Sequence, residues 1–219
     1  MNDRLIFPGK RRSASVTRRN LLVGGAIAGV SSAIGLSALA RPGEASPASD
    51  AANDARILNT ALYYEHQAIW AYGFAATKLS DTAVGGAVKA LALRNQADHM
   101  AHRDALTSAV QSLGGMPVTA EQSYDVSAYL ERGEGNLDSD VNIAKLALAL
   151  EVDAAIAYAT EIANLKTPAL ITAGASIGST ESAHATAIRA AFVSLGVSID
   201  YVPAPLVSAS TRDAWILKV

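Results

Sequence analysis

The sequence predicts an all-α protein built around four long helices. Half of the 219 residues are apolar, alanine is abundant and aromatic residues are few, a composition that favours closely packed helices. Apolar residues recur at steps of three and four along four separate stretches, which is the spacing of one helix face. The four stretches also fall into two similar pairs, so we expect two helical hairpins around a shared core.

The ends of the four helices are marked in the sequence. The break at Ser80-Asp81-Thr82 separates the first helix from the second, and Gly114-Gly115 followed by Pro117 ends the second. Residues 114–138 show no clear periodicity and are long enough to cross the whole bundle. The expected helices span about residues 50–79, 83–113, 139–166 and 168–195.

Residues 1–40 are expected to be a targeting segment that is not part of the fold. The pair Arg18-Arg19 precedes an uncharged run over residues 21–40, which ends in the small-x-small cleavage sequence Ala38-Leu39-Ala40. This arrangement resembles a bacterial twin-arginine (Tat) signal, so we expect export to the periplasm or the medium without stable membrane association after cleavage. Cleavage after Ala45 and a transmembrane anchor are the alternatives.

The rest of the chain is expected to form one domain with a tail. Residues 41–49 have the composition of a linker, residues 50–196 hold the four helices, and residues 197–219 are expected to pack on the bundle. Within this tail, residues 210–217 are predicted to form a short helix that places Trp215 against the bundle.

Charge and cysteine content exclude several functions. The formal net charge is −2, but the chain after residue 40 carries about −7, because six of the 18 Lys and Arg residues lie before it. This balance disfavours nucleic acid as a partner. The chain has no cysteine, which excludes disulfides, thiolate metal sites and covalently attached c-type haem.

The first and third helices share one sequence pattern. Residues 61–72 read ALYYEHQAIWAY and residues 147–158 read ALALEVDAAIAY, so both spell A-L-x-x-E-x-x-A-x-x-A-Y. The pattern places Glu65 and Glu151 on the inward faces of their helices. The tyrosines that end the two stretches, Tyr72 and Tyr158, are expected to be core residues whose hydroxyls can lie near the site.

The second and fourth helices carry matching polar pairs on their inward faces. These are His99-x-x-His102 and Glu181-x-x-His184, and in each the second histidine lies eleven residues before a Leu-Gly pair. A buried carboxylate or imidazole must be paired, hydrogen-bonded or bound to metal, because a bare buried charge costs several kcal/mol. All these positions lie far from the helix ends, so they can meet in one cluster. The candidate metal ligands are Glu65, His99, His102, Glu151, Glu181 and His184.

These features resemble the ferritin-like superfamily, and more narrowly exported bacterial ferritin-like domains that carry a twin-arginine signal. The resemblance covers about residues 53–196. It is carried by Tyr64-Glu65-His66-Gln67-Ala68 and by residues 99–106, which read HMAHRDAL and precede the break at Gly114. It implies an antiparallel four-helix bundle with one long crossover between the second and third helices, into which residues 114–138 fit.

The chain departs from the family pattern at one ligand. Di-iron members have Glu-x-x-His on the second and fourth helices, whereas His99 stands here in the place of the bridging Glu. A carboxylate can bridge two metal ions, but a neutral imidazole offers one lone pair. The site therefore holds two metals with one bridge, one metal, or none. Asp98 is either a replacement ligand or a partner of Arg94 or Arg103.

Two functions from different classes follow. The first is a metal-dependent oxidoreductase or metal-handling protein in stress, with iron or manganese as the expected ion and zinc as the weaker expectation. The second is a non-catalytic exported bundle, either structural or metal-sequestering, with a degenerate site. The polar centre disfavours a third function, a bundle that binds a small apolar ligand or a partner helix. The expected partners are metal ions, the Tat export machinery and, as one option for assembly, a second copy of the chain in a homodimer.

Overall fold

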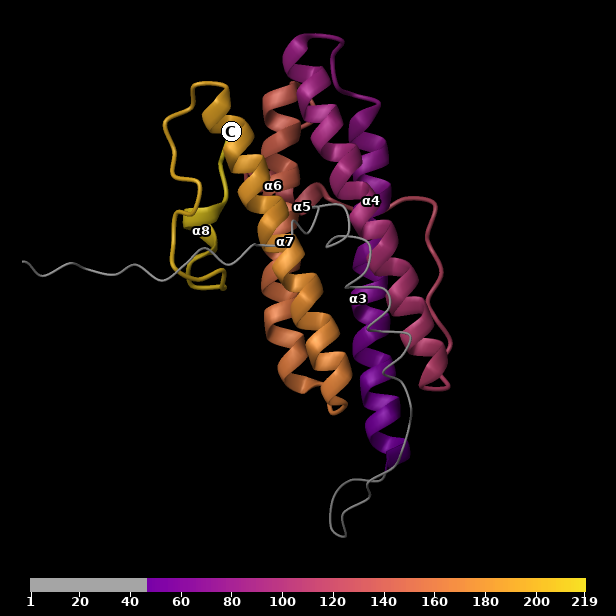
Figure 1. The fold of residues 1–219 in the computed structure, drawn as a ribbon. Helices are drawn as coiled ribbons and strands as arrows, with labels where there is room; N and C mark the ends of the chain where they lie inside the picture. The colour runs from indigo at the N-terminus through magenta and orange to yellow at the C-terminus, as the bar shows by residue number, and fades with distance from the viewer. Residues whose placement is uncertain (1–46) are drawn as a thin grey trace, which may run out of the picture.

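A computed structural model describes residues 47–219, which form an elongated helical bundle (Figure 1). The predicted signal segment, its cleavage sites and the first part of the linker lie outside the described residues, and they stay predictions. The described residues contain helices and no strand, so the all-α prediction is confirmed. Among them, no helix is both long enough and apolar enough to cross a membrane. The four long helices are α3 (Pro47–Ala76), α4 (Ala83–Ser112), α6 (Asp140–Glu161) and α7 (Pro168–Ser194).

The helix ends differ from the sequence prediction at a few places. Helix α3 includes residues 47–49, which were expected in the linker, because a proline such as Pro47 is compatible with the first turn of a helix. Helix α6 ends at Glu161 and continues as the 3-10 turn η1 (Ile162–Asn164), and residue 167, which precedes Pro168, is extended. The connection 114–138 contains a short helix, α5 (Ser127–Glu131), that its sequence pattern did not reveal.

The long helices form two antiparallel hairpins that pack side by side. Helix α3 packs mainly on α4, and α6 packs mainly on α7 (Figure 1). The connection after α4 runs back along the bundle before α6 begins, so it is the long crossover that the ferritin-like resemblance implies. Asp54, a fully buried carboxylate near the start of α3, binds the second hairpin through hydrogen bonds. It accepts the backbone N–H groups of Lys166 and Thr167, at 2.8 and 2.9 Å, directly before α7.

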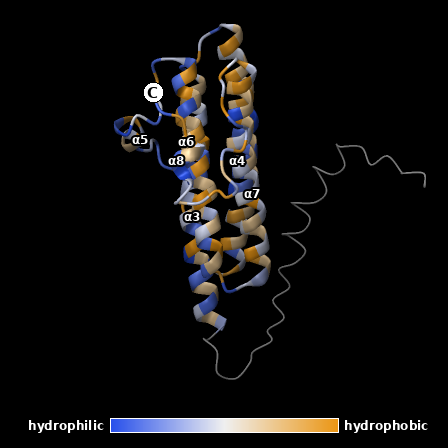
Figure 2. Ribbon diagram, turned by 90° about the vertical axis from the view of Figure 1, so that its left-hand side faces the viewer, coloured by the Kyte–Doolittle hydropathy of each residue, from blue (hydrophilic) through white to orange (hydrophobic). Residues whose placement is uncertain are grey.

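Two apolar clusters hold the bundle together and leave a polar layer between them. One cluster contains Leu62 of α3 and Val110 of α4, both with no exposed surface, together with the start of α7. The other contains Leu148 of α6 and Phe192 near the end of α7. Because neighbouring helices run in opposite directions, these residues lie on opposite sides of mid-bundle. Hydrophobic and hydrophilic residues alternate along each long helix, as expected for helices with one buried face (Figure 2).

The C-terminal tail packs on the second hairpin. Its short helix α8 (Arg212–Trp215) places Trp215 in the α6–α7 cluster with 3% of its surface exposed. The guanidinium of Arg212 binds Glu134 of the crossover through two hydrogen bonds of 2.7 Å, and it also contacts Asp153 of α6. One side chain therefore joins the tail, the crossover and the bundle.

Candidate metal centre

The six predicted ligands come together at mid-height of the bundle, between the two apolar clusters. Their ligand atoms form two groups of four, and within each group the atoms lie within 4.8 Å of one another. Each group draws side chains from both hairpins. Two residues, His99 and Glu181, belong to both groups. The first group is completed by Glu65 and His102, and the second by Glu151 and His184.

In the first group, two imidazoles lie against the carboxylate of α3. His99 Nδ1 is 2.8 Å from Glu65 Oε2, and His102 Nδ1 is 3.6 Å from the same oxygen. His102 Nδ1 is also 3.0 Å from Glu181 Oε1. Three helices therefore meet at one small volume lined by nitrogen and oxygen atoms.

In the second group, His184 takes the place that His102 has in the first. Its Nδ1 is 3.2 Å from Glu151 Oε2 and 3.3 Å from Glu181 Oε2. His99 Nε2 is 3.3 Å from Glu151 Oε1 and 3.8 Å from Glu181 Oε2. The imidazole of His99 thus lies between the two groups, with one nitrogen directed to each.

Glu181 is the most unusual side chain in the cluster. It has no exposed surface, yet neither of its carboxylate oxygens accepts a hydrogen bond, and the buried His102 Nδ1 also lacks a hydrogen-bond partner. A buried carboxylate without hydrogen bonds is costly unless a cation compensates it. Its two oxygens face different groups, which is the arrangement that a carboxylate bridging two cations requires.

Asp98 fixes the orientation of one histidine. Its Oδ2 lies 3.2 Å from His184 Nε2, and its other oxygen is 2.7 Å from Arg94 Nη1. With Nε2 directed at Asp98, Nδ1 of the same ring faces Glu151 and Glu181. Metal-binding histidines are commonly held in this way by a carboxylate. Asp98 is therefore a partner of His184 and Arg94, and it belongs to neither ligand group.

Two tyrosines hold the carboxylates of the opposite hairpin. Tyr72 of α3 donates a hydrogen bond to Glu151 Oε1, and Tyr158 of α6 donates one to Glu65 Oε1. Tyr158 can approach closely because Gly178 faces it on α7, where an added Cβ would lie 2.9 Å from the tyrosine Cβ. Both tyrosines are thus core residues, as the sequence predicted, and their hydroxyls lie at the glutamates.

The carboxylates and imidazoles of the cluster shift one another's pKa values. Burial raises the pKa of Glu65, but the contacts with His102 and His99 outweigh burial and lower the pKa to about 2. Burial lowers the pKa of His184, but Glu151 and Glu181 raise it to about 10. Burial raises the pKa of Glu181, and the nearby imidazoles of His102 and His184 offset this only in part. The cluster is therefore a set of carboxylates that attract positive charge.

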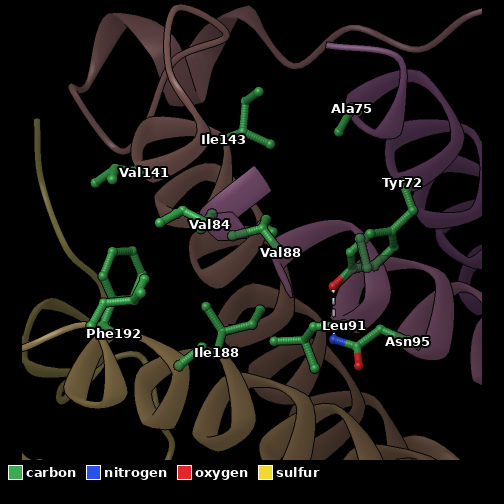
Figure 3. Close-up of a pocket in the computed structure, with 15 residues that line it drawn as sticks. Tyr72, Ala75, Val84, Val88, Leu91, Asn95, Val141, Ile143, Ile188 and Phe192 are labelled. Carbon is green, nitrogen blue, oxygen red and sulfur yellow. Dashed lines mark hydrogen bonds between the residues drawn. The ribbon is translucent and has the colours of Figure 1, made fainter. Parts of the chain in front are cut away.

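A small apolar cavity, called the apolar chamber below, lies between the candidate metal centre and the second apolar cluster. Figure 3 shows side chains such as Leu91, Ile143 and Phe192 around a space of about 40 Å³, with Tyr72 and Asn95 at its edge. Asn95 Nδ2 donates a hydrogen bond of 3.0 Å to the Tyr72 hydroxyl, which is the dashed line in Figure 3. This pair separates the apolar side chains from the carboxylates and orients the tyrosine toward Glu151.

Comparison with known protein families identifies the domain that contains these side chains. A family model described as a ferritin-like domain matches residues 53–194, which include all six candidate ligands and both tyrosines. No curated protein matches the chain.

Proposed function

Since this chain belongs to the ferritin-like family, we propose that it binds one or two iron or manganese ions in the centre between its hairpins. The observation that carries the proposal is the buried carboxylate of Glu181, whose oxygens accept no hydrogen bond and face both ligand groups. Nitrogen and oxygen ligands of this kind suit iron and manganese, and also zinc.

The residues present fit two ions with unequal surroundings. Three carboxylates with neutral imidazoles carry about −3, so two divalent ions would leave the centre with an excess positive charge. The ion beside His184 has the better support, because Asp98 holds that histidine and adds a negative charge nearby. We therefore propose that this position fills first and that the position beside His102 binds more weakly.

As an oxidoreductase, the protein would use the bound ion for electron transfer and for binding oxygen or peroxide. The chain itself supplies the surroundings for that chemistry. Tyr72 and Tyr158 hold two carboxylates in place, and the apolar layers above and below exclude water. A role in metal handling under stress uses the same ligands without a separate substrate.

The contacts of His99 favour a second, non-catalytic function. This imidazole lies 2.8 Å from Glu65 and 3.3 Å from Glu151, so it neutralises part of the cluster without any metal ion. A centre stabilised in this way could serve a structural bundle or one that sequesters a single ion. Such a protein would keep its stability when metal is removed.

Metal analysis of the purified protein separates these functions. About two equivalents of iron with oxygen-dependent absorbance would support the oxidoreductase, and zinc or no metal with chelator-insensitive stability would support the second function. Glu181→Gln should remove metal binding and keep the helices, because it retains the shape of the side chain. Glu161→Gln, an exposed change at the end of α6, is the matched control. Metal binding by Glu181→Gln at the wild-type level would refute the site.

We also propose that the protein is exported through the Tat pathway to the periplasm or the medium. This rests on the pair Arg18-Arg19 and the uncharged run after it. Replacement of both arginines by lysine should leave the chain in the cytoplasmic fraction, which cell fractionation measures. Export of this variant at the wild-type level would contradict the proposal.

A further inference from the structure

A cavity of about 380 Å³ lies between α3 and α6, beside the candidate metal centre. Glu65, His99 and Glu151 form part of its wall, and the two tyrosines that bind the glutamates line it as well. A molecule in this cavity would therefore lie directly against three of the six candidate ligands. Its volume is within the range of sites that bind small organic molecules, about 300–1,000 Å³.

Small side chains keep this space open. Ala61 and Ala68 face it from α3, and Ala154 and Ala157 face it from α6. Each helix packs mainly on its own hairpin partner, and contacts between α3 and α6 are few by comparison. The polar centre thus occupies only the inner wall of the cavity, and apolar side chains form much of the rest.

The charges that line the cavity select against anions. Four carboxylates line it, from Glu65, Glu151, Asp153 and Glu161, and no Lys or Arg of the described residues does so. The one basic group, His99, is already engaged with two of these carboxylates. Of these four carboxylates only Asp153 is paired with an arginine, Arg212, so a ligand with a carboxylate or phosphate would meet the like charges of the other three.

We propose that this cavity binds an uncharged aromatic alcohol, of the size of a substituted phenol, as the organic co-substrate of the metal centre. The proposal rests on the metal-binding function proposed above. The aromatic ring would pack among the alanines and the rings of Tyr64 and Tyr129, which also line the cavity. The hydroxyl would lie at the inner wall, where carboxylate oxygens accept hydrogen bonds.

The apolar chamber in Figure 3 is a different space. Its volume of about 40 Å³ is too small for an aromatic molecule, and its walls are almost entirely apolar. Tyr72 lines both spaces, so its ring is the wall between them. Access of an organic molecule to the carboxylates is therefore from the α3–α6 side.

The test uses 4-methylphenol as the probe and measures its binding to the full-length protein by isothermal titration calorimetry and ligand-observed NMR. We expect binding of 4-methylphenol, and affinity for 4-methylbenzoate at least about tenfold lower because of the carboxylates. Ala154→Phe and Ala157→Phe, made separately, should each lower the affinity for 4-methylphenol by about tenfold or more, because the added ring fills the cavity. Ala183→Phe, on the exposed face of α7, is the matched control and should bind as wild type does.

Three results would overturn the proposal: no binding of 4-methylphenol, equal binding of 4-methylbenzoate, or wild-type affinity in the folded phenylalanine variants. Circular dichroism checks that each variant is helical. Ala157 is already exposed, so its variant keeps the test decisive if Ala154→Phe does not fold. Metal titration of the same proteins reports the proposed function separately. Metal binding without probe binding contradicts only the cavity proposal. Probe binding without metal binding contradicts the metal proposal, and with it the co-substrate role, but shows that the cavity binds the phenol.

Discussion

Tyr72 of α3 donates its phenolic hydrogen bond to Glu151 of α6, in the other hairpin of the bundle. The reciprocal bond joins Tyr158 of α6 to Glu65 of α3. In each helix the tyrosine follows the glutamate by seven residues, which is two helical turns or about 10.5 Å. Because α3 and α6 run in opposite directions, this equal spacing places each tyrosine opposite the glutamate of the other helix.

Removal of either tyrosine hydroxyl should weaken metal binding. Tyr72→Phe and Tyr158→Phe keep the ring but leave one carboxylate free to rotate, so we expect metal affinity to fall about 10- to 100-fold. Anaerobic calorimetric titration with Fe²⁺ or Mn²⁺ measures this. Tyr201→Phe, at an exposed position in the tail, should have no effect. Equal affinity in all four proteins would show that the crossed bonds do not position the ligands.

Asp98→Ala should affect one metal position more than the other. His184 loses the carboxylate that holds its Nε2, so the tighter binding step should weaken by about 10- to 100-fold while the weaker step changes little. The two steps are separated in a stepwise metal titration. Asp104→Ala on the exposed side of the same helix is the control. Loss of both steps together would argue against unequal positions.

His99→Glu restores a second carboxylate able to bridge two ions. With metal, this variant should retain two equivalents more firmly than wild type. Without metal, it places a fourth carboxylate in the buried cluster and removes an imidazole, so we expect a loss of about 3 kcal/mol in the free energy of unfolding. Metal content after dialysis and thermal unfolding with and without Mn²⁺ measure the two effects. A variant that is less stable in both conditions would refute the bridging role.

Glu134 should make stability depend on pH. Its hydrogen bonds with Arg212 lower its pKa from 4.5 to about 2, although burial opposes the shift. A lowered pKa in the folded state stabilises the protein above pH 4.5, and this stabilisation is lost as pH falls toward 2. The difference in free energy of unfolding between wild type and Glu134→Gln should therefore shrink by about 2 kcal/mol between pH 7 and pH 2. Urea unfolding at both pH values measures it, and a constant difference would contradict the assignment.

The sequence was sufficient to predict the helices and the inward positions of the six polar side chains, because both depend on local spacing. The inward position of Glu181 and His184 follows from helical periodicity within one segment, and the shared pattern around Glu65 and Glu151 indicates their equal depth. The structure confirms the all-α fold, and the family match confirms the ferritin-like family; the export signal stays a prediction. Whether the six side chains bind metal stays a prediction.

The contacts that sequence could not predict all join segments far apart in the chain. The pairing of Asp98 with His184 depends on the rotation of α4 against α7, which no local pattern encodes. Helix α5 has five residues, too few to show a period, and the crossover that carries it is held by the long-range bond from Arg212 to Glu134. The crossed tyrosine bonds follow from equal seven-residue spacings only once antiparallel packing is known.

Each ligand group combines side chains from both hairpins, and this has a consequence for biosynthesis. A chain that has been synthesised only as far as Ser112 holds Glu65, His99 and His102, but it lacks Glu181, which both groups share. An emerging first hairpin therefore offers no complete cage for an ion. Under the proposed function, loading would wait until the last long helix has docked, so the acquisition of metal would report that the whole bundle has assembled.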